Sequence, residues 1–180
     1  MKQLKNTPET AEFTEETALA FFARYLDERK WPCNRLADGS TLLSGFNGAE
    51  ALWDFNLTAR QKSAGLFLLG VNSFIPNKVR PERRAACAEL LSRLNFELML
   101  GCFEMNYDDG ELRFRTSVLL PGADITSGIV EHLVGFNLST VDECLKSILA
   151  VLYSDATPEQ ALQAQMERAE NKLEPRIDLN

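Results

Sequence analysis

The sequence contains one histidine, His132, and no CxxC pair among its four cysteines. Zinc sites need several His and Cys ligands at close spacing, so the sequence predicts no metal site of that kind. A Ser-His-acid or Cys-His catalytic machine would have to use His132, and no GxSxG motif accompanies it. We therefore predict no catalytic residues, no metal and no cofactor. An enzyme that depends on His132 is kept as an alternative.

Glycine-rich phosphate loops and long apolar runs are also missing. The chain has neither GxGxxG nor GxxxxGK[ST], the loops that hold nucleotide phosphates. No apolar run approaches the roughly 20 residues that a membrane helix needs. The opening MKQLKNTPETAEFTEE has no apolar segment behind its lysines, so we expect no secretory signal. These absences favour a cytoplasmic protein that does not associate with membranes.

Basic residues are scarce relative to acidic ones. Lys and Arg number 19 and Asp and Glu number 26, which gives a formal net charge of −7. Phosphates would be repelled over most of such a surface, so we expect no nucleic-acid partner. Protein partners and small ligands are left open. In a reducing cytosol, scattered cysteines are expected to act as small buried hydrophobes; these are Cys33, Cys87, Cys102 and Cys144.

The composition is that of an ordinary globular protein. Apolar residues make up 45% and charged residues 25% of the 180 residues, enough for one domain with a core of its own. We expect a flexible N-terminal lead-in over residues 1–13 and a single domain over residues 14–165. Residues 166–180 are expected to hold the end of a C-terminal helix and a tail.

Four segments have helix signals. The first helix is expected to start at the capping residue Thr14, and the second to run from near Pro81 to Gly101. The third is expected to start near residue 126 and to kink or break within 135–140, where Gly, Asn, Ser and Thr gather. The last is expected to begin at Thr157 with a capping box.

The remaining apolar segments read as strands. RLADGSTLLSGFNGAEALWDFNLTAR predicts two strands with Asp-Gly and Asn-Gly turns, and GLFLLGVNSFIP predicts a central strand. FEMNYDDGELRFRTSVLL predicts a hairpin with a two-residue turn at Asp109-Gly110, which places Glu104 opposite Arg115. We interpret these charges as a cross-strand ion pair on a solvated face. The fold class is therefore α+β, an antiparallel sheet of about five strands with helices packed on it, in the order α-β-β-β-α-β-β-α(-α).

Two groups of residues are candidates for binding. Aromatic residues concentrate in the strands, and those that face away from the helices would form an apolar patch for a protein partner; core packing is the alternative. The candidates in the strands are Phe46, Trp53, Phe55, Phe67 and Phe74, and Phe96 of the second helix is added to them. A basic cluster at the start of the second helix is a candidate anion site, with an in-chain acid or plain solvation as the alternative; it comprises Lys78, Arg80, Arg83 and Arg84.

Several short motifs carry a resemblance to a known family. They are Asn95-Phe96, Gly101-Cys102-Phe103-Glu104, Asp109 to Arg115, Val151-Leu152-Tyr153 and Thr157 to Ala161. In these motifs, over roughly residues 14–165, the chain resembles the YbjN family, whose members are often labelled bacterial sensory transduction regulators. Leu152 and Ser154-Asp155 depart from the usual pattern. The family has no established catalytic residues, so none is carried over.

The resemblance implies a fold similar to type III secretion chaperones, usually assembled as a homodimer. It further implies a non-enzymatic, chaperone- or adaptor-like role in binding another protein, in regulation or stress signalling. The alternative function is a signalling regulator that senses a small anion at the basic cluster of residues 78–84.

Overall fold

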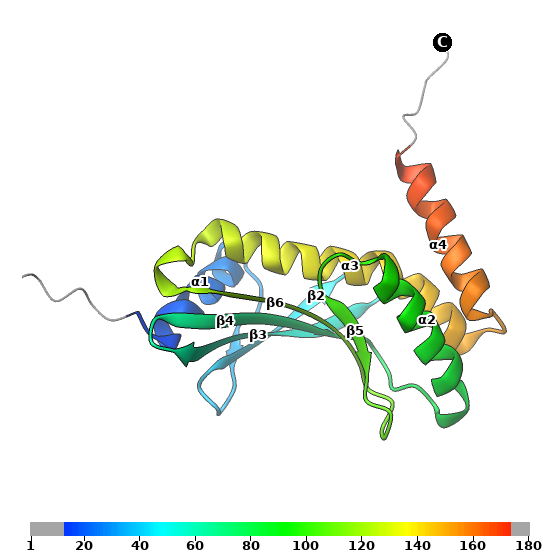
Figure 1. The fold of residues 1–180 in the computed structure, drawn as a ribbon, viewed down its shortest axis with the longest axis horizontal. Helices are drawn as coiled ribbons and strands as arrows, with labels where there is room; N and C mark the ends of the chain where they lie inside the picture. The colour runs from blue at the N-terminus through cyan, green and yellow to red at the C-terminus, as the bar shows by residue number, and fades with distance from the viewer. Residues whose placement is uncertain (1–12, 174–180) are drawn as a thin grey trace, which may run out of the picture.

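The structure, a computed structural model, describes residues 13–173. It is an α+β fold with one antiparallel sheet, as the sequence predicts (Figure 1). The helices and strands are α1 (Glu15–Glu28), β1 (Asn34–Arg35), β2 (Thr41–Asn47), β3 (Leu52–Ser63), β4 (Leu66–Phe74), α2 (Arg84–Glu97), β5 (Cys102–Met105), β6 (Leu112–Pro121), α3 (Ser127–Tyr153) and α4 (Pro158–Leu173). Short 3-10 turns, Pro81–Arg83 and Gly122–Asp124, precede α2 and α3.

The strand order is β1-β2-β3-β4-β6-β5, and every neighbouring pair is antiparallel. The sheet has six strands where about five are predicted, because two-residue β1 pairs with β2. β4 lies inside the sheet between β3 and β6, as its continuous apolar sequence predicts. The predicted order of helices and strands is otherwise confirmed.

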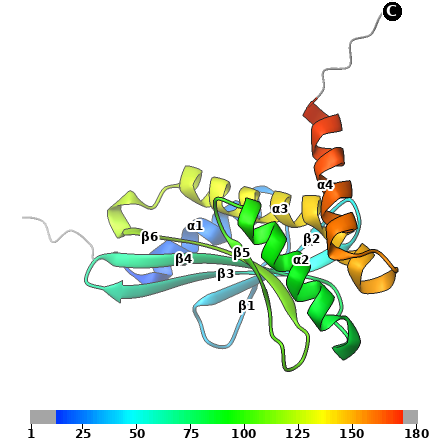
Figure 2. The same cartoon turned by 45° about the vertical axis from the view of Figure 1, so that its right-hand side comes forward.

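α1 and α3 cover one face of the sheet, and the core lies between these helices and the sheet. α1 begins at the predicted capping residue Thr14, which accepts a hydrogen bond from the amide of Thr17. The helix buries Ala18, Leu19, Phe22, Tyr25 and Leu26. α2 packs beside β5 and α3, and α4 packs on α2 and α3 before its far end points away from the sheet (Figure 2). α4 begins with the predicted reciprocal cap between Thr157 and Gln160.

The predicted break in the third helix is wrong, because α3 is one helix of 27 residues. Asn137, which the sequence suggests as a breaker, is fully buried and bonds to β4 and β6. The hydroxyl of Thr140 donates a hydrogen bond to the carbonyl oxygen of Phe136 in the same helix, 2.8 Å away. Tertiary hydrogen bonds of Asn137 and a bond of Thr140 within the helix thus satisfy polar groups that would otherwise compete with the helical backbone.

The predicted hairpin exists, but its register differs by two residues. Glu104 lies opposite Arg113 rather than Arg115, and the connection is the six residues 106–111 rather than a two-residue turn. A shift of two keeps every side chain on its predicted face, so alternation alone cannot reveal it. The loop is set by its own bonds: the amide of Gly110 donates to the carbonyl of Asn106, 2.8 Å away. The second helix also ends earlier than predicted, at Glu97.

Candidate protein-binding site

The six aromatic candidates divide between the core and the surface. Trp53, Phe55 and Phe67 are 0–2% exposed beneath α1 and α3, so the prediction that they face a partner is wrong. Phe46 is half-buried and packs against Trp53, with ring centroids 5.0 Å apart. These side chains fill the space between sheet and helices, as the alternative predicts.

The two remaining aromatic candidates do reach the surface. Phe74 is half-buried on the open face of the sheet, opposite Arg113. Phe96, near the end of α2, is 88% exposed. Two residues of the α2–β5 connection that the sequence did not single out, Met99 and Leu100, are exposed beside it along the chain. Exposed apolar residues therefore gather at this end of the sheet.

Each cation of the basic cluster contacts oxygen atoms of the chain itself. Lys78 pairs with Asp109, and Arg80 lies 3.9 Å from Glu82. Arg83 lies 3.5 Å from Asp155.

Arg84 completes the cluster by donating to the backbone carbonyl of Tyr107, 2.9 Å away. Three of the four cations lie near a carboxylate and the fourth near a carbonyl, and these contacts offset part of the charge at the start of α2. The geometry therefore favours the in-chain alternative over an anion site.

The hairpin charges form a shared ion pair at the β5–β6 edge. Glu104 accepts from Arg113 over 2.6 Å and also pairs with Arg115. Burial tends to raise the pKa of Glu104, but the bond and charge of Arg113 and the charge of Arg115 outweigh it, so the pKa lies below its usual value. One carboxylate thus serves two guanidinium groups, and Glu111 lines the same hollow as Glu104 and Arg113.

β6 is covered unevenly by its two neighbours. β4 pairs with it from Arg113 to Pro121, whereas β5 pairs only with Leu112–Arg115. Within residues 13–173, the outer side of 116–121 therefore has no strand partner. Gly101, with a φ of +78°, stands where the chain enters β5 and turns beside Thr116.

The alternation of an antiparallel ladder identifies which backbone groups this edge exposes. Each residue directs its N–H and C=O to the same neighbour, and successive residues alternate sides. The carbonyl of Leu112 accepts from Ile75 on the β4 side. The odd-numbered residues Ser117 and Leu119 therefore direct their N–H and C=O outward, and both are exposed.

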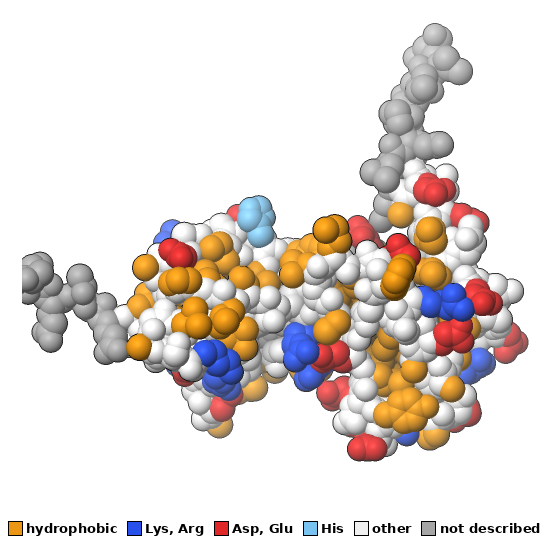
Figure 3. Space-filling model, in the orientation of Figure 1, with side chains coloured by type: hydrophobic (Ala, Val, Ile, Leu, Met, Phe, Trp, Pro, Cys, Tyr) orange, Lys and Arg blue, Asp and Glu red, His pale blue; other side chains and the backbone are white. Residues whose placement is uncertain are grey.

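A groove runs between this free edge and α3. It measures about 690 Å³ and is mainly apolar. Its walls are Val118 of β6, three apolar residues of α3 and Leu100 of the α2–β5 connection; the α3 residues are Ile129, Leu133 and Phe136. His132 and Glu131 stand at its rim. Figure 3 shows hydrophobic side chains gathered over the part of the molecule where α3 lies beside β6.

Gly135 of α3 keeps this groove open. It lines the groove, and a Cβ atom added there would meet no described atom within 4 Å. From the sequence alone, Gly135 is expected only to kink or break the third helix. The signal that could have revealed the groove is the SVLL end of the hairpin, where Val118, Leu119 and Leu120 put apolar residues on both faces of β6.

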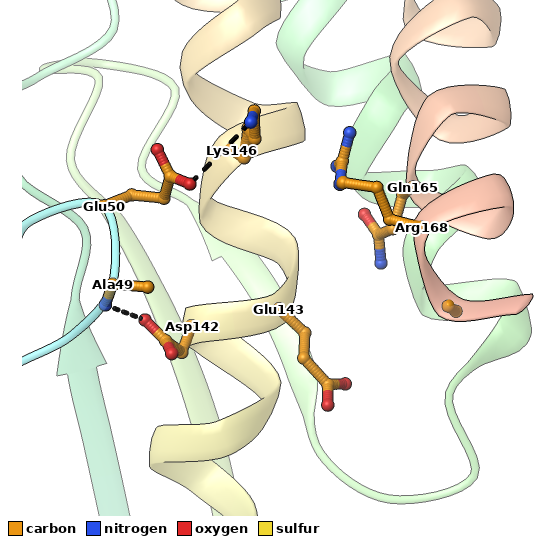
Figure 4. Close-up of a pocket in the computed structure, with 8 residues that line it drawn as sticks. Ala49, Glu50, Asp142, Glu143, Lys146, Gln165 and Arg168 are labelled. Carbon is orange, nitrogen blue, oxygen red and sulfur yellow. Dashed lines mark hydrogen bonds and ion pairs between the residues drawn. The ribbon is translucent and has the colours of Figure 1, made fainter. Parts of the chain in front are cut away.

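A second cavity lies between α3, α4 and the loop after β2 (Figure 4). It measures about 450 Å³ and has charged walls. Asp142 accepts from the amide of Ala49 over 2.7 Å, and Lys146 lies 3.9 Å from Glu50. Arg168 donates to Ser147 over 2.8 Å. These contacts hold the loop and α4 on α3, which is a structural role.

Neither a metal site nor a membrane span emerges from residues 13–173. No group of three or more His, Cys, Asp and Glu side chains is placed to hold a metal ion there. None of the helices in this range is long and apolar enough to cross a membrane. His132, on which the enzyme alternative depends, is exposed on α3.

A family model described as "Putative bacterial sensory transduction regulator" matches residues 20–150 of the chain. The chain belongs to the YbjN family. The match includes β6, the groove and the first three of the motifs that suggested the family, whereas Val151-Leu152-Tyr153 and Thr157 to Ala161 lie beyond it.

The chain is similar to the crystal structure of "YbjN, a putative transcription regulator from E. coli", at 14% identity and a TM-score of 0.44. The similarity covers 83% of this chain and 93% of that chain. The comparison with curated proteins found no match.

Proposed function

We propose that this chain is a non-enzymatic, cytoplasmic regulator that acts by binding another protein, in the manner of a chaperone or adaptor. The observation that carries the proposal is the apolar groove beside the unpaired edge of β6. Apolar surface that is exposed to water next to free backbone groups is unfavourable in free energy. A partner that covers this surface removes that unfavourable exposure. The regulatory description of the YbjN family is consistent with a protein that acts through partners.

The anion-sensing alternative is not carried forward. Every cation of the cluster at residues 78–84 contacts an oxygen of the same chain. The groove, in contrast, is mainly apolar. Protein binding therefore has a specific surface in its favour, and anion sensing has none.

Site-specific photo-crosslinking in the cells that make this protein tests the proposed function. A photoreactive amino acid replaces Leu119, which is 54% exposed on the β6 edge. The control replaces Leu36, which is 41% exposed near β1 at the opposite edge of the sheet. We expect a discrete protein adduct from position 119 and not from position 36. No adduct from either position, or the same adducts from both, would contradict the proposal.

A further inference from the structure

The free edge of β6 is built to accept another strand. Ser117 and Leu119 direct both of their backbone groups away from β4, and an extended chain laid along them would pair with these groups. Such strand addition supplies affinity through main-chain hydrogen bonds, with side-chain pockets supplying specificity. Residues 116–121 carry no charged side chain, and no strand within residues 13–173 pairs with their outer side; only Pro121, at the end, is a residue that typically protects an edge.

The two sides of β6 fix the side-chain pattern of such a strand. Alternate residues of an added strand would point toward α3, beside Val118, and into the groove. These positions require apolar side chains. The intervening residues would lie on the open face of the sheet, beside Leu119 and Arg115. The occupant is therefore an extended segment in which apolar residues recur at every second position.

The positive charge of Arg115, where the pairing with β5 ends, adds a second requirement for the bound segment. Arg113 and Arg115 share the single carboxylate of Glu104, and Arg115 is 48% exposed. An acidic residue opposite Ser117 would lie diagonally across from Arg115 on the same face. A second copy of this chain that paired through its own β6 edge would offer residues 116–121, TSVLLP, which contain no acid. The charge pattern thus favours a different protein over a second copy.

We propose that the β6–α3 groove binds an extended segment of a partner protein, which adds a strand to β6. The segment has apolar residues at alternate positions and an acidic residue beside Arg115. This inference rests on the proposed protein-binding function and names the chemistry of the partner at that site.

Selection of random dodecapeptides displayed on phage against the purified full chain tests the sequence pattern. We expect enriched peptides with apolar residues at alternate positions and at least one Asp or Glu. Enrichment of basic peptides, or of helical apolar spacing, would overturn the inference. So would the absence of any enriched pattern.

A groove-filling variant tests where the selected peptides bind. Gly135→Trp places a large side chain in the groove, and its Cβ meets no atom within 4 Å, so the chain is expected to fold. Gly128→Trp is the matched control: it lies in α3 outside the groove, and its Cβ has only Thr126 nearby, at 3.9 Å. We expect Gly135→Trp to weaken peptide binding by at least about tenfold and Gly128→Trp to leave it within about twofold.

Two further variants separate the backbone and charge contributions. Ser117→Pro removes an outward N–H while leaving the β4 ladder intact, and is expected to weaken binding by about tenfold. Arg115→Glu is expected to weaken the binding of acidic peptides by about threefold to tenfold and to favour the binding of peptides that contain Lys. Circular dichroism and thermal unfolding of each variant show whether it is folded.

The outcomes distinguish the inference from the proposed function. Peptides that bind equally to the wild type and to folded Gly135→Trp would place the site elsewhere and overturn the groove inference. The photo-crosslinking adduct would still support protein binding in that case. A dimer that Gly135→Trp converts to a monomer would show that a second copy occupies the groove. Tighter peptide binding after deletion of residues 1–12 would show that the chain's own N-terminal segment competes for it. Either result overturns the partner assignment.

Discussion

The hydroxyl group of Ser73 on β4 donates a hydrogen bond to the side-chain oxygen of Asn137 on α3, over 2.6 Å, and both residues are 0% exposed. The amide of Asn137 in turn donates to the hydroxyl of Thr116 on β6, 3.2 Å away. One helical side chain thus connects α3 to two neighbouring strands. This connection fixes the position of α3, one wall of the groove, relative to β6, another wall.

Asn137→Leu is expected to destabilise the fold by about 2–4 kcal/mol, because two buried hydroxyls, Ser73 and Thr116, lose their partner. Urea unfolding followed by circular dichroism measures the change. Ser139→Ala is the control on the exposed side of α3 and is expected to change the stability by less than about 0.5 kcal/mol. Equal midpoints for wild type and Asn137→Leu would contradict the structural role.

Glu104 gives the stability a defined acid dependence. Burial raises its pKa, but Arg113 and Arg115 lower it further, so the folded pKa lies below the ordinary 4.5. Its stabilising contribution is therefore fully present above pH 4.5 and is lost as the pH falls through the folded pKa.

Urea midpoints measured across this pH range test the assignment. Glu104→Gln is expected to be less stable than wild type at neutral pH, with a difference that shrinks below pH 4.5. The exposed Glu97→Gln serves as control, with a difference near zero throughout. A Glu104→Gln difference that does not depend on pH would remove the ion pair from the explanation.

Gly110 anchors the β5–β6 hairpin to the chain before α2. It has a φ of +79°, and an added Cβ would lie too close to the carbonyl oxygen of Val79. Gly110→Ala is expected to cost about 2–4 kcal/mol, from backbone strain and displacement of Val79. Gly65→Ala, with a similar φ of +72° but no atom within 4 Å, is expected to show only the strain of about 1 kcal/mol. Thermal unfolding compares the two, and equal losses would exclude the Val79 contact.

The four cysteines are expected to react with a thiol reagent at very different rates. Burial raises the pKa of Cys87 and of Cys144 to about 11, so their thiolates are scarce in the folded protein. Cys33 is exposed, contrary to the prediction that all four are buried, and Cys102 is half-buried. In a time course, Cys33→Ser should abolish the fastest phase, and Cys87 and Cys144 should react only on unfolding. Fast labelling of either buried thiol in the native state would contradict this placement.

The homodimer that the family resemblance implies stays a prediction. Multi-angle light scattering on the purified chain should give about twice its 20.2 kDa mass if it holds. A mass of 20.2 kDa at all concentrations would exclude it. The partner inference requires that any dimer leaves the β6 edge free, so Gly135→Trp should not change the mass.

The hairpin illustrates how far sequence patterns reach. Alternation correctly assigned Glu104, Arg113 and Arg115 to one solvated face, and the ion pair of Glu104 with Arg115 exists. The register was wrong by two residues, because a pattern of period two is unchanged by such a shift. What decides the register is the set of loop bonds around Gly110 and its contact with Val79, a residue distant in the sequence.

The candidate site shows a similar limit. The sequence indicated aromatic strand residues for binding, yet Trp53, Phe55 and Phe67 fill the core. For the groove residues Ile129 and Leu133, the sequence predicts only that they belong to the third helix. Whether an apolar residue is covered depends on what lies across from it, and local spacing contains no information about that.

The sequence by itself determined where the helices begin, most of the strands, the α+β class and the family, because caps, turn residues and apolar periodicity are local signals. Only the tertiary structure decided that β5 stops short, that Asn137 joins α3 to two strands, and that Gly135 faces an unpaired edge. Each of these depends on which segments meet across the fold. That pairing is set by the packing of the whole core, which no single stretch of residues encodes.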